Sequence, residues 1–231
     1  MYEHISGRLA EVRDRIANAA GRAGRSPDSV RLIAVSKTHP VDAVRAAADA
    51  GQLDFGENKV QEALYKVAQS QDSRLRWHLV GHLQSNKAKK AAAVVDTVHA
   101  IDSVDLLRRV DEAAGAVGRS LEALVQVDLA LEDTKHGAPV AEVNRIFAAA
   151  AECRSVALVG MMLLPPLVDD PEDARPWFAR LRSLRDQLAE AGVPSTRLRE
   201  LSMGMSHDFA VAIEEGATMV RIGTAIFGAR G

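Results

Sequence analysis

Three things are scarce in this sequence, and each scarcity excludes a class of protein. Cysteine occurs once, as Cys153, which excludes an internal disulfide and is typical of a reducing, intracellular setting. Excess charge is nearly absent: the net charge is −2 at pH 7, so no overall positive field draws nucleic acid or an acidic membrane. No apolar run approaches the roughly 20 residues of a membrane span.

The first 25 residues also lack the apolar core of a signal peptide. They form a charged, amphipathic stretch with helical spacing of the apolar residues Ile5, Leu9, Val12, Ile16, Ala19 and Ala20. We therefore predict a helix over 3–23 and a cytoplasmic protein with neither a membrane nor a nucleic-acid partner. A chain of 231 residues buries enough surface to fold without a structural metal.

The most informative stretch is "LIAVSKTHP", residues 32–40. It begins as an unbroken apolar run, the pattern of a strand covered on both faces in a parallel sheet. Lys37 stands at the exit of that strand, and Pro40 and Asp42 open a helical pattern. A partly desolvated lysine presents a neutral amine for imine chemistry. The alternative is an ordinary solvated lysine in a strand-to-helix loop.

Strand-like and helical segments alternate along the whole chain. We predict strands at 32–35, 53–58, 77–80, 96–101, 124–129, 156–164, 200–203 and 219–222. Eight such units predict an α/β fold, a single (β/α)8 TIM-type barrel domain over residues 1–231 with an extra N-terminal helix. An open doubly wound sheet is the alternative, but such sheets usually carry a glycine-rich turn after the first strand, where this chain has Ser-Lys-Thr-His.

A barrel would bring the exits of its strands to one face, including Lys37, Asn58, His82, Met161 and Arg221. The loops after the last two strands often hold a phosphate in such barrels. Here they read "SMGMS" (202–206) and "GTA" (223–225), which offer hydroxyl groups and backbone amides that a ligand can approach closely. We expect Ser202 or Ser206 to cap the following helix. Ordinary turn chemistry is the alternative.

Arg221 interrupts an apolar strand, "MVRIG", so its charge needs a partner inside the fold. That partner is either a ligand or a carboxylate of a neighbouring strand or helix. An imine-forming lysine, a phosphate site and a buried arginine together suit an aldehyde that carries a phosphate and an acceptor atom.

Five motifs resemble those of the pyridoxal 5′-phosphate (PLP) homeostasis proteins, also called proline synthetase co-transcribed homologues. They are "AVSKTHP", "DFGENKVQEA", "WHLVGHLQSNKAKKA", "LVGMMLLPP" and "LSMGMSHDFAVAIEEGATMVRIGTAIFG", and they span nearly the whole chain. The resemblance implies a fold-type III PLP protein, a single barrel like the N-terminal domain of alanine racemase. It also implies that the protein binds PLP as an internal aldimine and serves in intracellular PLP homeostasis.

The same resemblance implies roles for individual residues. Lys37 would form the Schiff base, Arg221 would face the pyridine nitrogen, and Asn58 would lie near the ring. The phosphate would be held by the loop residues Ser202, Gly204, Ser206, Gly223 and Thr224. The chain departs from the family at "GMMLLPP", where a threonine is expected, and at Asp128, where asparagine is common. These departures leave open the contacts on the side of the ring, including any role of Met161 or Leu163.

Residue chemistry favours a carrier over a catalyst. PLP enzymes that break bonds at the α-carbon often protonate the pyridine nitrogen through a carboxylate, which an arginine cannot replace because it stays charged. Alanine racemase has a similar arginine but adds a tyrosine from a second domain. This chain has only Tyr2 and Tyr65, and we expect Tyr65 to pack within a helix. We expect hydrogen-bonding or surface roles for His82 and His207.

The leading hypothesis is therefore a monomeric PLP carrier that exchanges its cargo transiently with apo PLP-dependent enzymes. A PLP-dependent amino-acid enzyme, such as a weak racemase, is the first alternative. A cofactor-free Schiff-base aldolase acting on a phosphorylated sugar is the second. The cluster Lys87, Lys89 and Lys90 is interpreted as a solvated helix face, with a second PLP or partner site as its alternative.

Overall fold

The computed structural model describes residues 2, 4–130 and 136–228. Within these residues, eight parallel strands follow one another in the order β4-β3-β2-β1-β9-β8-β7-β5. The first and last of them, β4 and β5, also pair with each other, which closes the sheet into a barrel. The strands are β1 (Arg31–Val35), β2 (Asp54–Glu57), β3 (Arg76–Leu79), β4 (Thr97–Ile101), β5 (Leu121–Asp128), β7 (Val156–Met162), β8 (Glu200–Ser202) and β9 (Met219–Ile222). The predicted barrel is confirmed, and closure excludes the open doubly wound sheet.

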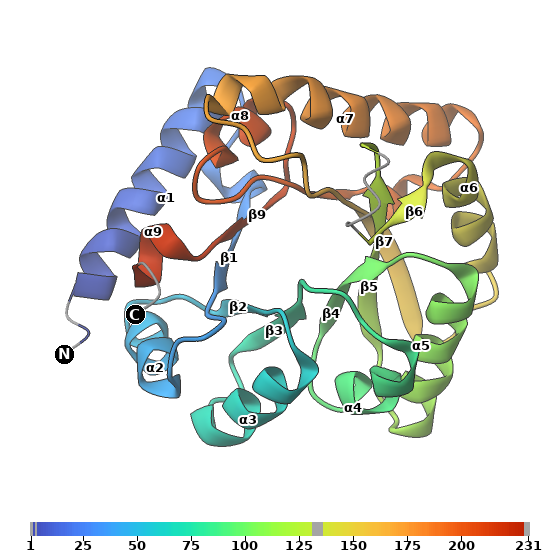
Figure 1. Cartoon of the computed structure of the whole chain (residues 1–231), viewed down its shortest axis with the longest axis horizontal. Coiled ribbons are helices and arrows are strands. Elements are labelled where there is room, and N and C mark those ends of the chain that lie inside the picture. Colours follow the sequence, from blue (N-terminus) through green and yellow to red (C-terminus); the bar gives the residue numbers. More distant parts are fainter. Residues whose placement is uncertain (1, 3, 131–135, 229–231) are drawn as a thin grey trace.

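Helices surround the barrel (Figure 1). They are α1 (His4–Arg22), α2 (Val41–Asp49), α3 (Val60–Ser70), α4 (Ala88–Ala92), α5 (Val104–Ala116), α6 (Val140–Ala149), α7 (Arg175–Glu190), α8 (Phe209–Glu214) and α9 (Thr224–Phe227). All eight barrel strands lie where the sequence predicts them, with β5 beginning at Leu121 rather than at 124. Between β3 and β4, Ser85–Lys87 forms a 3-10 turn that leads directly into the short helix α4.

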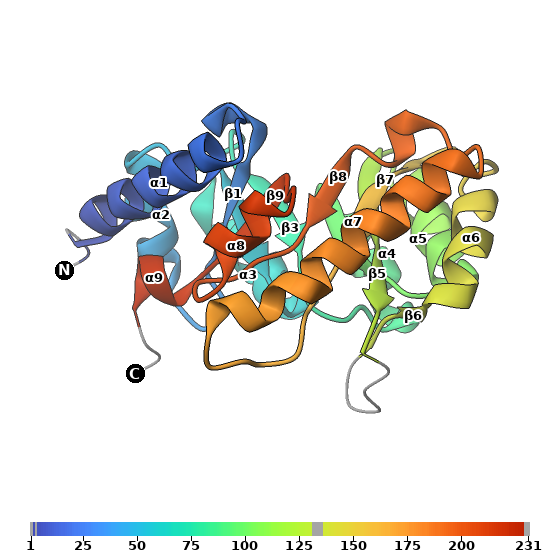
Figure 2. The same cartoon turned by 90° about the horizontal axis from the view of Figure 1, so that it is seen from above.

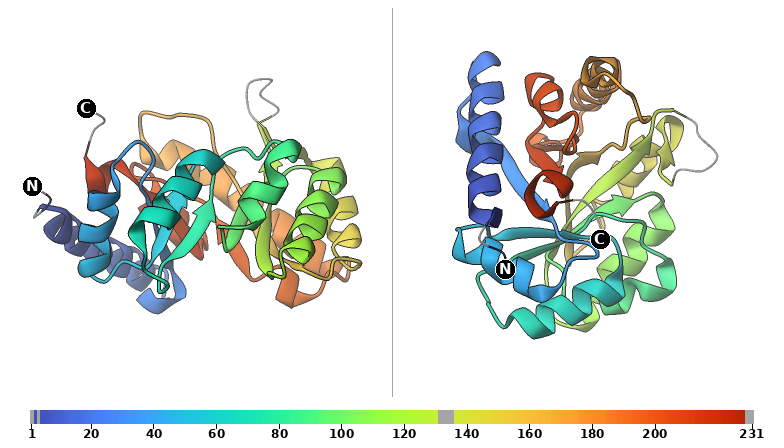
Figure 3. Two further views of the ribbon diagram at one scale, coloured as in Figure 1. Left: turned by 90° about the horizontal axis from the view of Figure 1, so that it is seen from below. Right: turned by 60° about the vertical axis from the view of Figure 1, so that its left-hand side comes forward.

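The extra N-terminal helix is also confirmed. The buried face of α1 consists of the predicted apolar residues, and it packs against α2, α8 and α9. Seen from above, α1 and α8 lie side by side, and α7 continues the same outer layer (Figure 2). The right-hand view of Figure 3 shows α1 and α8 beside each other again. α1 therefore covers the outside of the segment that carries the predicted phosphate loop.

Alternate residues of each strand face the barrel interior and the surrounding helices. The interior holds a small apolar cluster made of Ile33, Leu124, Val159, Met162 and Met219. Polar side chains share this interior, among them the buried Asp54, His78, His99, Ser202 and Arg221. A much larger apolar core lies between the strands and the helices. No helix in the described residues is both long and apolar enough to cross a bilayer.

Candidate functional site

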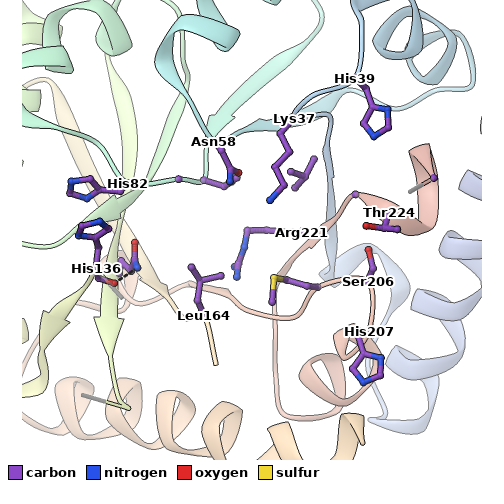
Figure 4. A pocket seen from close by; sticks show the side chains of 17 residues that line it. Lys37, His39, Asn58, His82, His136, Leu164, Ser206, His207, Arg221 and Thr224 are labelled. Atoms are coloured by element: carbon purple, nitrogen blue, oxygen red, sulfur yellow. Dashed lines mark hydrogen bonds between the residues drawn. The ribbon is translucent and has the colours of Figure 1, made fainter. Parts of the chain in front are cut away.

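The carboxyl ends of the barrel strands surround a cavity of about 570 Å³, a size that suits a small-molecule ligand. The cavity is lined by six of the predicted site residues, namely Lys37, Asn58, Ser206, Arg221, Gly223 and Thr224. Lys37 follows β1 and Arg221 lies on the neighbouring strand β9, and both side chains point into the cavity, whereas Ser206 and Thr224 face each other at one end (Figure 4). The topology of the barrel thus brings together residues that are far apart in sequence.

Lys37 is presented by a short turn that follows β1. The residue after it, Thr38, adopts a left-handed backbone conformation with φ +67°, which side chains other than glycine rarely adopt. The carboxylate of Glu62 on α3 accepts a hydrogen bond from the Thr38 backbone N–H at 2.5 Å. On the other side, the carbonyl of Ser36 accepts a hydrogen bond from Lys66 Nζ at 2.6 Å. Both flanks of Lys37 are therefore anchored to α3.

The anchor is a buried ionic cluster between the barrel and α3. Lys66 is 2% exposed and lies 2.6 Å from Glu57 Oε1 and 3.0 Å from Glu62 Oε1. The hydroxyl of Ser36 donates to Glu57 Oε1 at 2.6 Å. The other oxygen of Glu57 has no hydrogen-bond partner in the described part of the chain. Burial raises the pKa of Glu57 to about 7, although the Lys66 ammonium opposes this shift.

Arg221 projects from β9 into the cavity and is 4% exposed. Its Nη1 donates to Ser202 Oγ at 2.6 Å and its Nη2 to the Leu163 carbonyl at 2.8 Å. Among the described residues it forms no ion pair, and its hydrogen-bond partners are a hydroxyl and a backbone carbonyl rather than the carboxylate that the sequence left open. Burial lowers the pKa of Arg221 to about 10, with Asp208 acting in the opposite direction. The guanidinium stays charged at neutral pH, with further N–H groups available to a ligand.

The end of the cavity at α8 and α9 is rich in hydrogen-bond donors. Ser206 contributes its hydroxyl, which accepts a long hydrogen bond of 3.4 Å from the Ala225 N–H. Within the described residues, the backbone N–H groups of Ser206 and His207 have no acceptor. Gly223 and Thr224 complete this wall. Unpaired amides and hydroxyl groups at one end of a cavity are what an anionic group such as phosphate requires.

Ser202 and Gly204 lie behind the cavity wall rather than in it. Ser202 is fully buried, and its hydroxyl belongs to the Arg221 contact described above. Gly204 has φ +94°, and a Cβ at this position would lie 2.6 Å from the Ala212 Cβ on α8. The expected serine cap is wrong: the residue before α8 is Asp208, whose carboxylate accepts a hydrogen bond from the Met205 N–H at 2.6 Å. Ser202 and Gly204 therefore support the residues that line the cavity without lining it themselves.

Asn58 follows β2 and touches the cavity next to Gly81. A Cβ on Gly81 would lie 2.4 Å from the Asn58 carbonyl oxygen, so only glycine permits this close approach of the two strand exits. Met161 is fully buried in the outer core, which makes its expected place at the cavity wrong. Leu163 contributes only its carbonyl to Arg221, whereas the next residue, Leu164, lines the cavity.

Four histidines line the cavity, and the sequence pointed to only two of them, His82 and His207. The rings of His82 and His136 stack with centroids 3.7 Å apart. Burial, together with His136, lowers the pKa of His82. His207 contacts the Asp169 carbonyl at 2.9 Å, and the ring of the fourth, His39, lies 5.2 Å from that of Phe227. No periodic pattern marks His136, because it lies well beyond the end of β5 at Asp128 rather than at a strand exit.

Two further expectations concern side chains outside the cavity. Tyr65 is 59% exposed on α3, so the expected packing role is wrong. Lys89 and Lys90 are exposed on α4 and Lys87 is half-buried, an arrangement that fits a solvated helix face and leaves the second-site alternative untested.

Comparison with known proteins places this geometry in context. A family model of the alanine racemase N-terminal domain matches residues 8–231. The chain is 41% identical over 223 residues to a pyridoxal phosphate homeostasis protein of Aquifex aeolicus, covering 96% of this chain and 97% of that protein. It is 42% identical over 229 residues to a protein of the same name from Escherichia coli, covering 98% and 97%.

Solved structures with a similar fold include members of the same two groups of proteins. PipY of Synechococcus elongatus, solved with PLP bound, has a TM-score of 0.85 at 41% identity, covering 97% of this chain and 100% of that chain. An alanine racemase of Clostridium difficile has a TM-score of 0.75 at 16% identity, covering 97% of this chain and 56% of that one. At that identity the second likeness shows a shared barrel fold alone.

Proposed function

The chain belongs to the family of pyridoxal phosphate homeostasis proteins, and we propose that it binds PLP in the barrel cavity and serves in intracellular PLP homeostasis. The observation that supports this most is that Lys37 and Arg221, from the neighbouring strands β1 and β9, line one cavity with a donor-rich wall at its end. PLP carries an aldehyde, a ring nitrogen and a phosphate, and the cavity offers a suitable partner for each: an amine, a guanidinium and a cluster of hydroxyl and amide donors.

The cavity residues divide the binding of PLP among them. When bound, PLP supplies an aldehyde that condenses with a primary amine and releases water. Lys37 supplies that amine, Arg221 donates to the ring nitrogen, and Asn58 borders the ring. Ser206, Gly223 and Thr224 hold the phosphate through hydroxyl groups and backbone amides. Ser202 and Gly204 act indirectly, by holding Arg221 and by fitting α8 against the loop.

We assign the protein to the carriers rather than to the catalysts. Arg221 keeps its charge at neutral pH, so it cannot pass a proton to the ring nitrogen of PLP. Without that proton the PLP ring is a weaker electron sink. Tyr65 is too exposed on α3 to act as a base in the cavity. The curated relatives are named homeostasis proteins and not enzymes. Apo PLP-dependent enzymes are the partners that such a carrier would serve, in the cytoplasm.

The covalent attachment is tested on PLP-loaded protein reduced with borohydride and mapped by mass spectrometry. We expect one adduct, on Lys37, and we expect Lys37→Ala to lose both the adduct and the visible absorbance of the cofactor. Lys59→Ala is the matched control, because Lys59 is exposed and outside the cavity. Normal absorbance in Lys37→Ala would contradict the assignment. An additional adduct on Lys87, Lys89 or Lys90 would support a second site.

The carrier role is tested by transfer and by turnover. PLP-loaded protein should reactivate an apo PLP enzyme at a rate different from that of free PLP at equal concentration. A weak racemase is the second candidate, favoured by the histidines that line the cavity. Robust interconversion of D- and L-amino acids by the purified protein would overturn the carrier proposal, and a colourless protein without PLP would favour the aldolase.

A further inference from the structure

A series of polar side chains crosses the barrel interior from Arg221 to the opposite end. Arg221 Nη1 lies 2.6 Å from Ser202 Oγ, which lies 3.0 Å from His99 Nδ1. His99 Nε2 is 3.0 Å from His78 Nδ1, and His78 Nε2 is 3.0 Å from Asp54 Oδ1. Strands β9, β8, β4, β3 and β2 each contribute one member. Arg221 faces the cavity, whereas Asp54 lies at the amino ends of the strands.

All five members are buried. His99 and Ser202 are fully buried and His78 is 1% exposed, and they share the interior with the small apolar cluster. A buried donor or acceptor without a partner costs about 1–3 kcal/mol, so each hydrogen atom in the series must find an acceptor within it. This requirement determines where the hydrogen atoms lie.

The two ends of the series fix its direction. Arg221 can only donate, so Ser202 Oγ accepts from it. At the other end, burial of Asp54 opposes ionisation, but hydrogen bonds from His78 and Arg76 outweigh it and lower the Asp54 pKa. An ionised Asp54 can only accept, so His78 donates to it through Nε2–H. The remaining hydrogens are those on the Ser202 hydroxyl and between the two rings.

Only one arrangement pairs every hydrogen in the series. The Ser202 hydroxyl donates to His99 Nδ1, and His99 Nε2–H donates to His78 Nδ1. In the reverse arrangement His99 would donate to Ser202, and the Ser202 hydrogen would have no acceptor among the described residues. Burial, with the nearby His78 and Arg221, holds the pKa of His99 well below its usual value, which keeps this ring neutral as the arrangement requires.

We propose that His99 and His78 are positioning residues that, through Ser202, orient the Arg221 guanidinium toward the ring nitrogen of PLP. The inference rests on the proposed function, because it concerns the group that Arg221 meets in the cavity. Every hydrogen bond in the series points from Arg221 toward Asp54, so a cation and an anion hold three neutral groups between them in one orientation. Together with the Leu163 carbonyl, the series fixes the plane of the guanidinium before the ligand arrives.

The direction of the series is tested on the unliganded protein. We expect ¹⁵N spectra of labelled histidine rings to show His99 protonated at Nε2 and bare at Nδ1, and His78 protonated at Nε2. His99 protonated at Nδ1 would overturn the proposal. This measurement needs neither PLP nor a variant, so it holds whether or not the proposed function does.

The effect on the ligand is tested by a double-mutant cycle. His99→Leu and Ser202→Ala should each raise the PLP dissociation constant roughly three- to tenfold, the equivalent of one lost hydrogen bond. The double variant should be little worse than the more affected single variant, because both substitutions interrupt the same series. Val159→Ala, in the same interior cluster, is the control for loss of packing and should leave PLP binding unchanged.

The outcomes separate the two proposals. If the wild-type protein binds PLP on Lys37 and His99→Leu binds it as tightly, the positioning role is wrong and the carrier proposal stands. Equal weakening by Val159→Ala, or fully additive effects in the double variant, also overturns the positioning role. If the wild-type protein does not bind PLP, the proposed function fails, while the ring spectra still report on the series.

Discussion

Two features of position 204, its backbone conformation and its close approach to α8, can be met only by glycine. Its φ of +94° is unfavourable for any residue with a Cβ, and a Cβ here would approach Phe209 Cα to 2.9 Å. We expect Gly204→Ala to destabilise the fold by more than about 2 kcal/mol and to weaken PLP binding, because α8 must shift. Denaturant unfolding and PLP titration measure the two effects.

Gly192 provides the matched control for this prediction. It has φ +91°, and a Cβ at this position would meet nothing within 4 Å, so Gly192→Ala should cost only the backbone strain of about 1–2 kcal/mol. The difference between the two variants isolates the overlap with α8. Equal losses in both variants, with unchanged PLP binding, would show that the fit of Gly204 against α8 has no role.

Glu57 makes stability depend on pH. Its pKa is raised to about 7 in the native state, against about 4.3 in an unfolded chain. Between these values the native state binds a proton that the unfolded state does not, so the free energy of unfolding falls as pH rises from about 4.3 to 7, by at most about 1.4 kcal/mol per pH unit. Above pH 7 this contribution levels off.

Glu57→Gln removes the titrating group and should flatten the profile over that interval. Denaturant unfolding at half-unit steps from pH 5 to 8, on both proteins, gives the difference directly. Parallel profiles for the two proteins would refute a raised pKa of Glu57.

Residues at strand exits were predictable because the apolar runs locate the strands and the barrel brings their ends together. Lys37, Asn58 and Arg221 reach the cavity for this reason. Ser202 does not reach the cavity because it lies deeper in the barrel interior, where its hydroxyl accepts a hydrogen bond from Arg221, and the strand pattern does not show this depth. His39 and His136 carried no local signal, since neither lies in a strand or directly at a strand exit. The residue roles implied by family resemblance remain predictions until PLP binding is measured.

At the scale of elements, Lys66 ties α3 to the exits of β1 and β2. Lys66→Met should destabilise the protein by about 3–5 kcal/mol, because it leaves the buried Glu57 without its countercharge. Lys89→Met, on the exposed face of α4, should change stability by no more than about 0.5 kcal/mol. Thermal or denaturant unfolding at pH 7.5 compares them, and similar losses would rule out a role for the buried cluster.

Most elements followed from sequence because their patterns are long. The apolar runs of the strands and the helical spacing of α1 are each unambiguous over several residues. The short strand β6 (Ala138–Pro139) gave no such signal, because two residues that include a proline have no periodicity. The 3-10 turn before α4 also escaped prediction, since it continues the spacing of the helix that follows.

At the scale of the whole molecule, we expect a monomer in solution. All the residues to which we assign a role toward PLP belong to one chain. Light scattering coupled to size-exclusion chromatography should give a mass near 24.8 kDa, with and without PLP. A mass twice as large at micromolar concentration would show a dimer.

The strand β2 carries two unrelated polar assignments within four residues. Asp54 faces the interior and begins the series that reaches Arg221, whereas Glu57 faces outward and meets Lys66. Side chains alternate with a period of two, so a single inserted or deleted residue would exchange the two faces and bury each carboxylate opposite the wrong partner. Substitutions in β2 should therefore be tolerated far more easily than insertions or deletions. We expect natural relatives that keep both the Asp54 series and the Glu57–Lys66 pair to have no insertion or deletion in this strand.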